Sequence, residues 1–196
     1  SDKFLFYKEC QKNNIPTIKT NLLTNQLKKN NKKFIIKDRY GAGCSYVKIF
    51  KKYKDVENNN FDKIIQPYIN GKHYSLCLFF NQNNYNLLTV NKQKLEINDN
   101  DMIRLTNLHV NVPHNFHPKI NSLIFLIMKS FPGLRGYIGI DIIIKKDKIF
   151  IVEINPRITT SFIGMYETIG INIIDLIVES KYQKQIISGK SLLFKT

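Results

Sequence analysis

The chain is most informative where it reads Gly139-Ile140-Asp141 and then Ile151-Val152-Glu153-Ile154-Asn155-Pro156-Arg157. Runs of β-branched residues on both sides of a short polar segment predict a β-hairpin with strands at residues 137–145 and 149–154. A two-residue loop would make Asp141 and Glu153 diagonal neighbours, which weakens their pairing without abolishing it. If residues 146–148 instead form a three-residue loop, Asp141 lies directly opposite Glu153. Their side chains then share one face of the hairpin, about 5 Å apart.

Oxygen atoms converge on that face, since Asn155 lies two residues beyond Glu153 and shares its side of the strand. Two carboxylates and an amide among isoleucines and valines are costly unless a cation lies between them. Oxygen ligands of this kind suit Mg²⁺, or Mn²⁺, held together with substrate phosphates. The pattern therefore predicts a metal site at Asp141, Glu153 and Asn155, and the alternative is a surface hairpin with scattered polar residues.

A small-residue loop, Asp38-Arg39-Tyr40-Gly41-Ala42-Gly43-Cys44-Ser45, is the second candidate element. Its glycines allow backbone N–H groups to face an anion, and Lys37, at the end of the preceding strand, offers a positive charge to phosphate. It is not a Walker A loop, because no Gly-Lys-Ser/Thr ends it. A plain hairpin loop is the alternative.

An extended apolar segment, Ile64-Ile65-Gln66-Pro67-Tyr68-Ile69-Asn70-Gly71, is the third candidate element. The free backbone groups of such a segment can hydrogen-bond the edge of an adenine ring, while Ile and Tyr side chains cover its faces. An ordinary linker between two lobes is the alternative.

Hydrophobic periodicity predicts the remaining elements. A helix over residues 3–13 ends before Ile15-Pro16, because the residue before proline avoids the helical conformation. Further helices are expected at residues 21–30, 118–131, 161–169 and 172–181, and strands at residues 33–37, 46–50, 63–66, 73–80 and 85–91. Strands mixed with helices, without regular βαβ alternation, indicate an α+β fold.

Composition sets limits on the class of protein. A chain of 196 residues that is 43% hydrophobic can bury a core in one domain or two small lobes. No run of about 18 uncharged apolar residues occurs, so we expect no membrane span. The three cysteines, Cys10, Cys44 and Cys77, are far apart and fit neither a disulfide framework nor a zinc site, which favours a reducing, cytoplasmic setting.

The net charge of +15 invites a nucleic-acid interpretation. The lysines are scattered, however, in a sequence crowded with Asn, Ile, Tyr and Phe, which is typical of an AT-rich coding sequence. A basic surface alone provides only unspecific affinity for nucleic acid. A polyanionic small molecule such as ATP explains part of the charge equally well, so we expect no nucleic-acid partner.

Taken in order, these elements resemble the ATP-grasp superfamily of carboxylate–amine ligases. Asp2-Lys3 followed by a helix and Asn14-Ile15-Pro16 resembles the opening of that fold. The resemblance implies two α+β lobes that clasp ATP between antiparallel sheets, with residues 1–66 as the first lobe and residues 67–196 as the second. Within the superfamily, the chain is similar to the carboligase group known for tyramine–glutamate ligation.

The resemblance also implies a role for each matching residue. The residues implied to contact ATP are Lys3, Lys37, Gly41, Gly43, Ser45, Gln66, Pro67, Tyr68, Ile69 and His73. Gly41 to Ser45 would form a lid over the triphosphate, and His73 stands where such ligases often have a Glu for the ribose. The implied metal ligands are Asp141, Glu153 and Asn155. Arg157 and Lys37 would be catalytic, stabilising the transferring phosphoryl group.

The activity that follows is ATP-dependent ligation of a small carboxylate to an amine through an acyl phosphate. Ligases of this fold usually carry an N-terminal domain before the residues that match here, so we expect that part to be supplied elsewhere. A homodimer and the identity of both substrates are left open. Two alternatives are an ATP-binding module without full catalysis and a basic nucleic-acid-binding domain.

Overall fold

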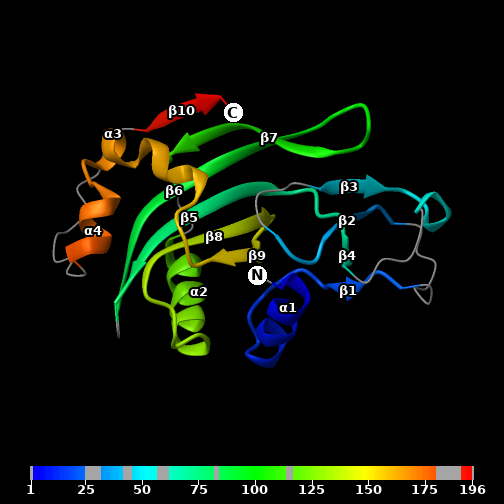
Figure 1. The fold of residues 1–196 in the computed structure, drawn as a ribbon, viewed down its shortest axis with the longest axis horizontal. Helices are drawn as coiled ribbons and strands as arrows, with labels where there is room; N and C mark the ends of the chain where they lie inside the picture. Colours follow the sequence, from blue (N-terminus) through cyan, green and yellow to red (C-terminus); the bar gives the residue numbers. More distant parts are fainter. Residues whose placement is uncertain are drawn as a thin grey trace.

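The computed structural model describes residues 2–24, 32–41, 46–56, 62–81, 84–113, 117–179 and 191–195. They form two antiparallel sheets with helices, which confirms the α+β class (Figure 1). The smaller sheet contains β1 (Asn21–Leu22), β2 (Phe34–Asp38), β3 (Val47–Phe50) and β4 (Lys63–Pro67). The larger sheet contains β5 (Lys72–Phe80), β6 (Tyr85–Ile97), β7 (Ile103–Val110), β8 (Gly136–Lys145), β9 (Lys148–Asn155) and β10 (Leu192–Lys195). The α-helices are α1 (Lys3–Lys12), α2 (His117–Ser130), α3 (Met165–Ile169) and α4 (Ile173–Glu179), and the 3₁₀ turns are η1 (Tyr53–Asp55) and η2 (Thr160–Gly164).

The smaller sheet, in the strand order β1-β4-β2-β3, separates an apolar face from a face that carries Lys37. Phe34 and Ile36 on β2 pack with Leu23 and Ile65 in a core on one side of the sheet. Because side chains alternate along a strand, Ile35 and Lys37 lie on the opposite side. Both line the pocket described below.

The larger sheet, in the order β10-β7-β6-β5-β8-β9, is covered on both faces. On one face, Ile138, Ile140 and Ile142 of β8 share a core with α1 and α2. On the other face, Tyr137 packs with residues of α3 and α4. The same alternation puts Asp141 on the Tyr137 side, beyond the part that α3 and α4 cover.

Helix α1 begins and ends where the sequence predicts. The Asp2 carboxylate caps it by accepting from the backbone N–H groups of Phe4 and Leu5, at 2.9 and 3.1 Å. The helix ends before Ile15, whose N–H bonds back to the carbonyl oxygen of Cys10. Cys10 lies in the core of the larger sheet. The first helix of the chain therefore packs with the larger sheet, although β1, which follows it, belongs to the smaller one.

One sequence prediction is wrong, and two strands of the larger sheet were not predicted. The helix expected at residues 21–30 is wrong at its start, because Asn21–Leu22 is a strand that pairs with Ile65 and Ile64 of β4. Residues 25–31 lie outside the described residues. Strands β7 and β10 were not predicted, since β7 mixes polar and apolar side chains and β10 forms only by pairing with it.

The hairpin β8–β9 differs from the prediction in its loop. Lys145 pairs with Lys148, so the turn has two residues, Lys146 and Asp147, in place of the three expected. A shorter loop alone would have moved every later pair by one position. The register shifts once more between Asp141 and Ile142, which leaves Val152 as an extra residue on β9. The expected pairing of Asp141 with Glu153 is thereby restored.

The cysteines that the structure describes, Cys10 and Cys77, are buried free thiols, and Cys44 lies outside the described residues. Within the described ranges, no helix has both the length and the apolar composition needed to cross a membrane.

Candidate active site

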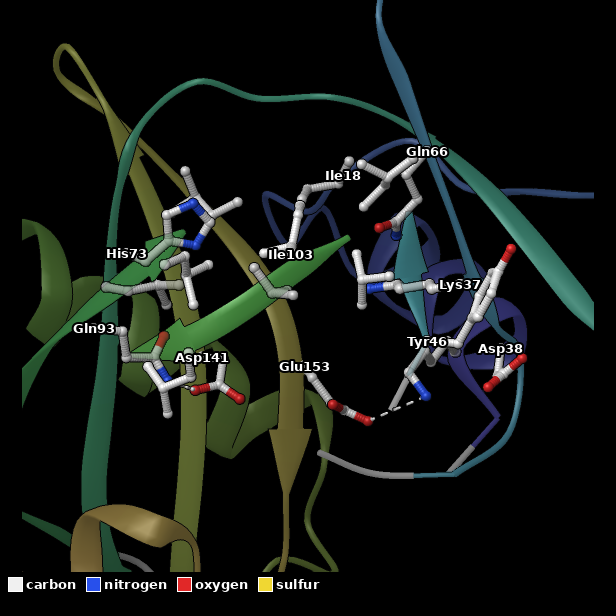
Figure 2. Close-up of a pocket in the computed structure, with 18 of the residues that line it drawn as sticks. Ile18, Lys37, Asp38, Tyr46, Gln66, His73, Gln93, Ile103, Asp141 and Glu153 are labelled. Atoms are coloured by element: carbon white, nitrogen blue, oxygen red, sulfur yellow. Dashed lines mark hydrogen bonds and ion pairs between the residues drawn. The ribbon is translucent and has the colours of Figure 1, made fainter. Parts of the chain in front are cut away.

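One pocket lies between the two sheets and collects polar side chains from both. Figure 2 shows two groups of side chains that face each other across this pocket. On the side of the smaller sheet lie Lys37, Gln66 and Tyr46, and on the side of the larger sheet lie His73, Gln93, Asp141 and Glu153. The apolar part of its lining consists of Ile18, Ile35, Val47, Leu95, Ile103, Leu105, Ile142, Ile143 and Val152. Charged and polar groups together with such an apolar lining are the usual features of a site for a polar, ring-containing ligand.

Asp141 and Glu153 form the negative part of the pocket. They are direct partners across β8 and β9. Burial, followed by the repulsion from Glu153, raises the pKa of Asp141 to about 6. The hydrogen bond from Gln93, whose Nε2 donates to Asp141 Oδ1 at 3.1 Å, partly offsets this rise in pKa. Asn155 Nδ2 donates to the other carboxylate oxygen, Asp141 Oδ2, at 3.2 Å. Asp141 therefore takes up a proton at a higher pH than an ordinary aspartate does.

Lys3 and Lys37 bring positive charge to the same pocket. The Lys3 ammonium lies 3.9 Å from Glu153 Oε1 and donates to the carbonyl oxygen of Gly41 at 3.1 Å. Lys3, the first residue of α1, thus connects this helix to the start of the glycine-rich loop and to β9. Lys37 is buried, with 6% of its surface exposed, and its charge acts to lower the pKa of Asp141.

Asn155 and Arg157 form a polar chain that leads away from Asp141. Arg157 Nη2 lies 3.3 Å from the Asn155 side-chain oxygen, and Arg157 Nη1 donates to the carbonyl oxygen of Ile158 at 3.0 Å. Neither residue lines the pocket: Arg157 is exposed and Asn155 is buried. The arginine is therefore linked to the carboxylates through Asn155.

His73 lines the pocket where the family resemblance led us to expect a contact with ribose. Burial lowers the pKa of His73 below its ordinary value. A neutral imidazole has one donor and one acceptor nitrogen, so it can bond a hydroxyl group in either direction.

The predicted residues are not all brought together. Lys3, Lys37, Gln66, His73, Asp141 and Glu153 line the pocket. Pro67, Tyr68 and Ile69 do not, and Tyr68 instead packs with Val47, Ile49 and Ile103. Gly41 is described, with a positive φ of 100°, but Gly43 and Ser45 lie outside the described residues.

Gln93 lines the pocket, although no role was predicted for it. It pairs with His73 across β5 and β6 and hydrogen-bonds Asp141. The signal that could have found it is the register of that pair of strands, which also puts Ser75 opposite Asn91. The sequence does not reveal this register, because the connection between the two strands does not fix which residues pair.

The carboxylate pair fits a small divalent cation. Burial, and after it the repulsion from Glu153, raises the pKa of Asp141, and the charge of a bound cation would oppose both effects. Mg²⁺ is commonly bound through one or two carboxylates together with substrate phosphates and water. No cluster of three or more His, Cys, Asp or Glu side chains suited to a metal ion occurs among the described residues.

Comparison with known proteins identifies the family of the chain. Residues 1–161 match the ATP-grasp domain family. The chain belongs to the ATP-grasp family. It is 35% identical over 109 residues to tyramine–L-glutamate ligase of Methanocaldococcus jannaschii, a match that covers 55% of this chain and 33% of the relative. It is 31% identical over 134 residues to the ligase of the same name from Methanocaldococcus fervens, which covers 68% of this chain and 40% of the relative.

The fold is shared with solved structures as well. N5-carboxyaminoimidazole synthetase from Staphylococcus aureus, complexed with ADP, superposes with a TM-score of 0.77 at 16% sequence identity. The match covers 98% of this chain and 55% of that one. The chain thus has the ATP-grasp fold, and its matches span less than half of the length of both ligases.

Proposed function

We propose that this chain is the nucleotide-binding and catalytic part of an ATP-dependent carboxylate–amine ligase. The observation that carries the proposal is the pocket between the two sheets, where Lys3 and Lys37 meet Asp141 and Glu153. Ammonium groups suit the phosphates of a nucleotide, and paired carboxylates suit a divalent cation that binds the same phosphates.

The relatives support both halves of this proposal. Two of them are named tyramine–L-glutamate ligase, and such a reaction joins a carboxylate to an amine. The synthetase of the same fold was solved with ADP. We therefore infer ATP as one substrate, and a small carboxylate and an amine as the others.

In this proposal, residues 1–66 and 67–196 act as two lobes that close on the nucleotide. Lys3 and Lys37 bind phosphate, and the glycine-rich loop with Gly41, Gly43 and Ser45 acts as the lid. The residues proposed for the nucleoside are Gln66, Pro67, Tyr68, Ile69 and His73. The apolar slot beside Gln66 is suited to a flat ring.

Asp141 and Glu153, together with Asn155, would hold Mg²⁺ or Mn²⁺. When bound, such an ion supplies positive charge that neutralises the phosphate oxygens. Arg157 is proposed to stabilise the transferring phosphoryl group, with Asn155 orienting its guanidinium through the 3.3 Å contact.

The reaction would proceed in two steps. An oxygen of the substrate carboxylate attacks the γ-phosphorus, and the bond from that phosphorus to the β-γ bridging oxygen breaks, so that ADP leaves and an acyl phosphate forms. The amine nitrogen then attacks the acyl carbon, the carbon–oxygen bond to phosphate breaks, and the nitrogen loses a proton. Phosphate and the amide are the products.

The test is ADP formation by the chain with Mg²⁺ and ATP, using tyramine and L-glutamate as the first substrate pair. Glu153→Gln should abolish metal-dependent ADP formation and weaken Mn²⁺ binding, followed by electron paramagnetic resonance. Glu96→Gln is the matched control, because Glu96 is a surface residue whose carboxylate pairs with Lys94 at 2.7 Å.

Unchanged ADP formation in Glu153→Gln would refute the proposed site. Tight ATP binding without ADP, over a panel of carboxylates and amines, would favour the alternative function of a nucleotide-binding module without catalysis. Salt-dependent binding of an oligonucleotide that is insensitive to Asp141 and Glu153 would favour the nucleic-acid alternative.

A further inference from the structure

A buried hydrogen-bond chain controls which atom of Gln66 is available to a ligand. Gln66 Nε2 donates to Thr20 Oγ1 at 2.7 Å, and Thr20 Oγ1 donates to the carbonyl oxygen of Ile18 at 2.9 Å. The exposed fractions are 4% for Gln66 and 1% for Thr20. Both links are therefore shielded from water.

The single hydrogen of the Thr20 hydroxyl group determines which atom donates and which accepts in these hydrogen bonds. Thr20 has one hydroxyl hydrogen, and that hydrogen is used on the Ile18 carbonyl. Its oxygen can therefore only accept from Gln66, which requires the carboxamide N–H₂ on that side. The carboxamide oxygen of Gln66 must then point the other way.

That oxygen lacks a donor. Gln66 Oε1 is buried and finds no hydrogen-bond partner among the residues that the structure describes. Gln66 lines the pocket, and Figure 2 shows its carboxamide in the space between the two sheets, near Lys37. An unsatisfied buried acceptor is costly, so a ligand that offers an N–H at this point gains affinity.

We propose that Thr20 determines base specificity by holding the Gln66 carboxamide with its oxygen toward the purine, so that it accepts from the exocyclic amino group of adenine. The inference rests on the proposed nucleotide function. A 6-oxo purine presents a carbonyl oxygen at the same position, and two acceptors then face each other in an apolar slot. Thr20 is a positioning residue in this scheme, and Gln66 makes the contact.

The test compares the dissociation constants of ATP and ITP, which differ at position 6 of the purine, by calorimetry with Mg²⁺ present. The wild-type chain should prefer ATP by roughly tenfold to one hundredfold. In Thr20→Val the carboxamide is released and can rotate, so the preference should approach parity, mainly through tighter ITP binding.

Thr17→Val is the matched control, because Thr17 also donates its hydroxyl hydrogen to a backbone carbonyl, that of Ile151 at 2.9 Å, but does not contact Gln66. It should keep the wild-type preference. Gln66→Met removes the acceptor while keeping the bulk of the side chain. It should lower ATP affinity toward that of ITP, and it tests the contact even if Thr20→Val fails to fold.

Equal binding of ATP and ITP by the wild-type chain would overturn the inference and leave the proposed function intact. Full ATP preference in a folded Thr20→Val variant would overturn the role of Thr20. Binding of neither nucleotide would reject the proposed function itself, and with it this inference.

Discussion

Asp141 on β8 lies directly opposite Glu153 on β9, and Val152 is the extra residue that makes this pairing possible. Between the turn and Ile142, the two strands pair in one register; beyond Val152, they pair in another. The bulge lets both carboxylates face the pocket although the two-residue turn by itself would have misaligned them. Bulges of this kind commonly re-aim a side chain next to an active site.

The pH dependence of stability should reflect Asp141. Its pKa is raised to about 6 in the folded chain, against roughly 3.9 when unfolded. Between these values the folded state holds more protons than the unfolded state, so stability falls as pH rises from about 4 to about 6 and stays reduced above that range. The expected loss is on the order of 3 kcal/mol, since one pKa unit corresponds to about 1.4 kcal/mol, and it is measured by urea unfolding without metal.

Asp141→Asn should remove this component of the pH profile. Asp147→Asn is its control, because Asp147 is 94% exposed in the turn of the same hairpin. If Asp141→Asn keeps the wild-type dependence of stability on pH, the titration of another group causes that dependence.

Lys37 should bind phosphate through its position on the pocket side of β2. Lys37→Gln is expected to weaken ATP binding by at least about tenfold, since a buried charged donor is lost. Lys48→Gln, on the neighbouring strand β3, removes an equal charge, but Lys48 pairs with Ile36 and lies on the opposite face of the sheet. Calorimetry at two salt concentrations measures both variants, and an equal loss in the two would indicate only a general effect of charge.

Gly139 should not tolerate a side chain, because a Cβ there would collide with the methyl group of Thr159. Gly139→Ala is expected to lower the free energy of unfolding by about 1–3 kcal/mol. Adding Thr159→Ser should recover most of that loss, since serine lacks the methyl but keeps the hydroxyl that lies 3.1 Å from the Tyr137 hydroxyl. Thermal unfolding of the single and double variants tests this, and additive losses would contradict it.

Asp2 should stabilise the chain at neutral pH through the α1 cap and through Arg39, whose Nη2 lies 2.6 Å from Asp2 Oδ2. The hydrogen bond from Arg39 is the main reason that the pKa of Asp2 is lowered. A lowered pKa contributes stability above roughly pH 4, and this contribution is lost as the pH falls further. Asp2→Ala should cost about 0.5–2 kcal/mol at pH 7.

The matching measurement is urea unfolding at pH 7 and at pH 3. The difference between wild type and Asp2→Ala should shrink at the lower pH. Asp99→Ala, in an exposed turn, should change little at either pH. A constant difference between pH 7 and pH 3 would argue against an electrostatic role for Asp2.

The sequence by itself determined the elements whose signals are local. Helix α2 follows from the spacing of Ile120, Leu123, Ile124 and Ile127, all buried on one face. The end of α1 follows from Ile15-Pro16, and the hairpin β8–β9 from its β-branched runs. Each signal depends on residues within a few positions of one another, so neighbours in the chain are sufficient to produce it.

Only the tertiary structure decided which distant groups meet. Lys3 lies near Glu153, which is 150 residues further along the chain, Gln93 hydrogen-bonds Asp141, and Thr20, just before β1, hydrogen-bonds Gln66. The bulge at Val152 restores the predicted pairing of Asp141 with Glu153, although the turn is one residue shorter than predicted. These contacts depend on strand register and on the packing of two sheets, both of which are set by the summed burial of many side chains and are not encoded in any short segment.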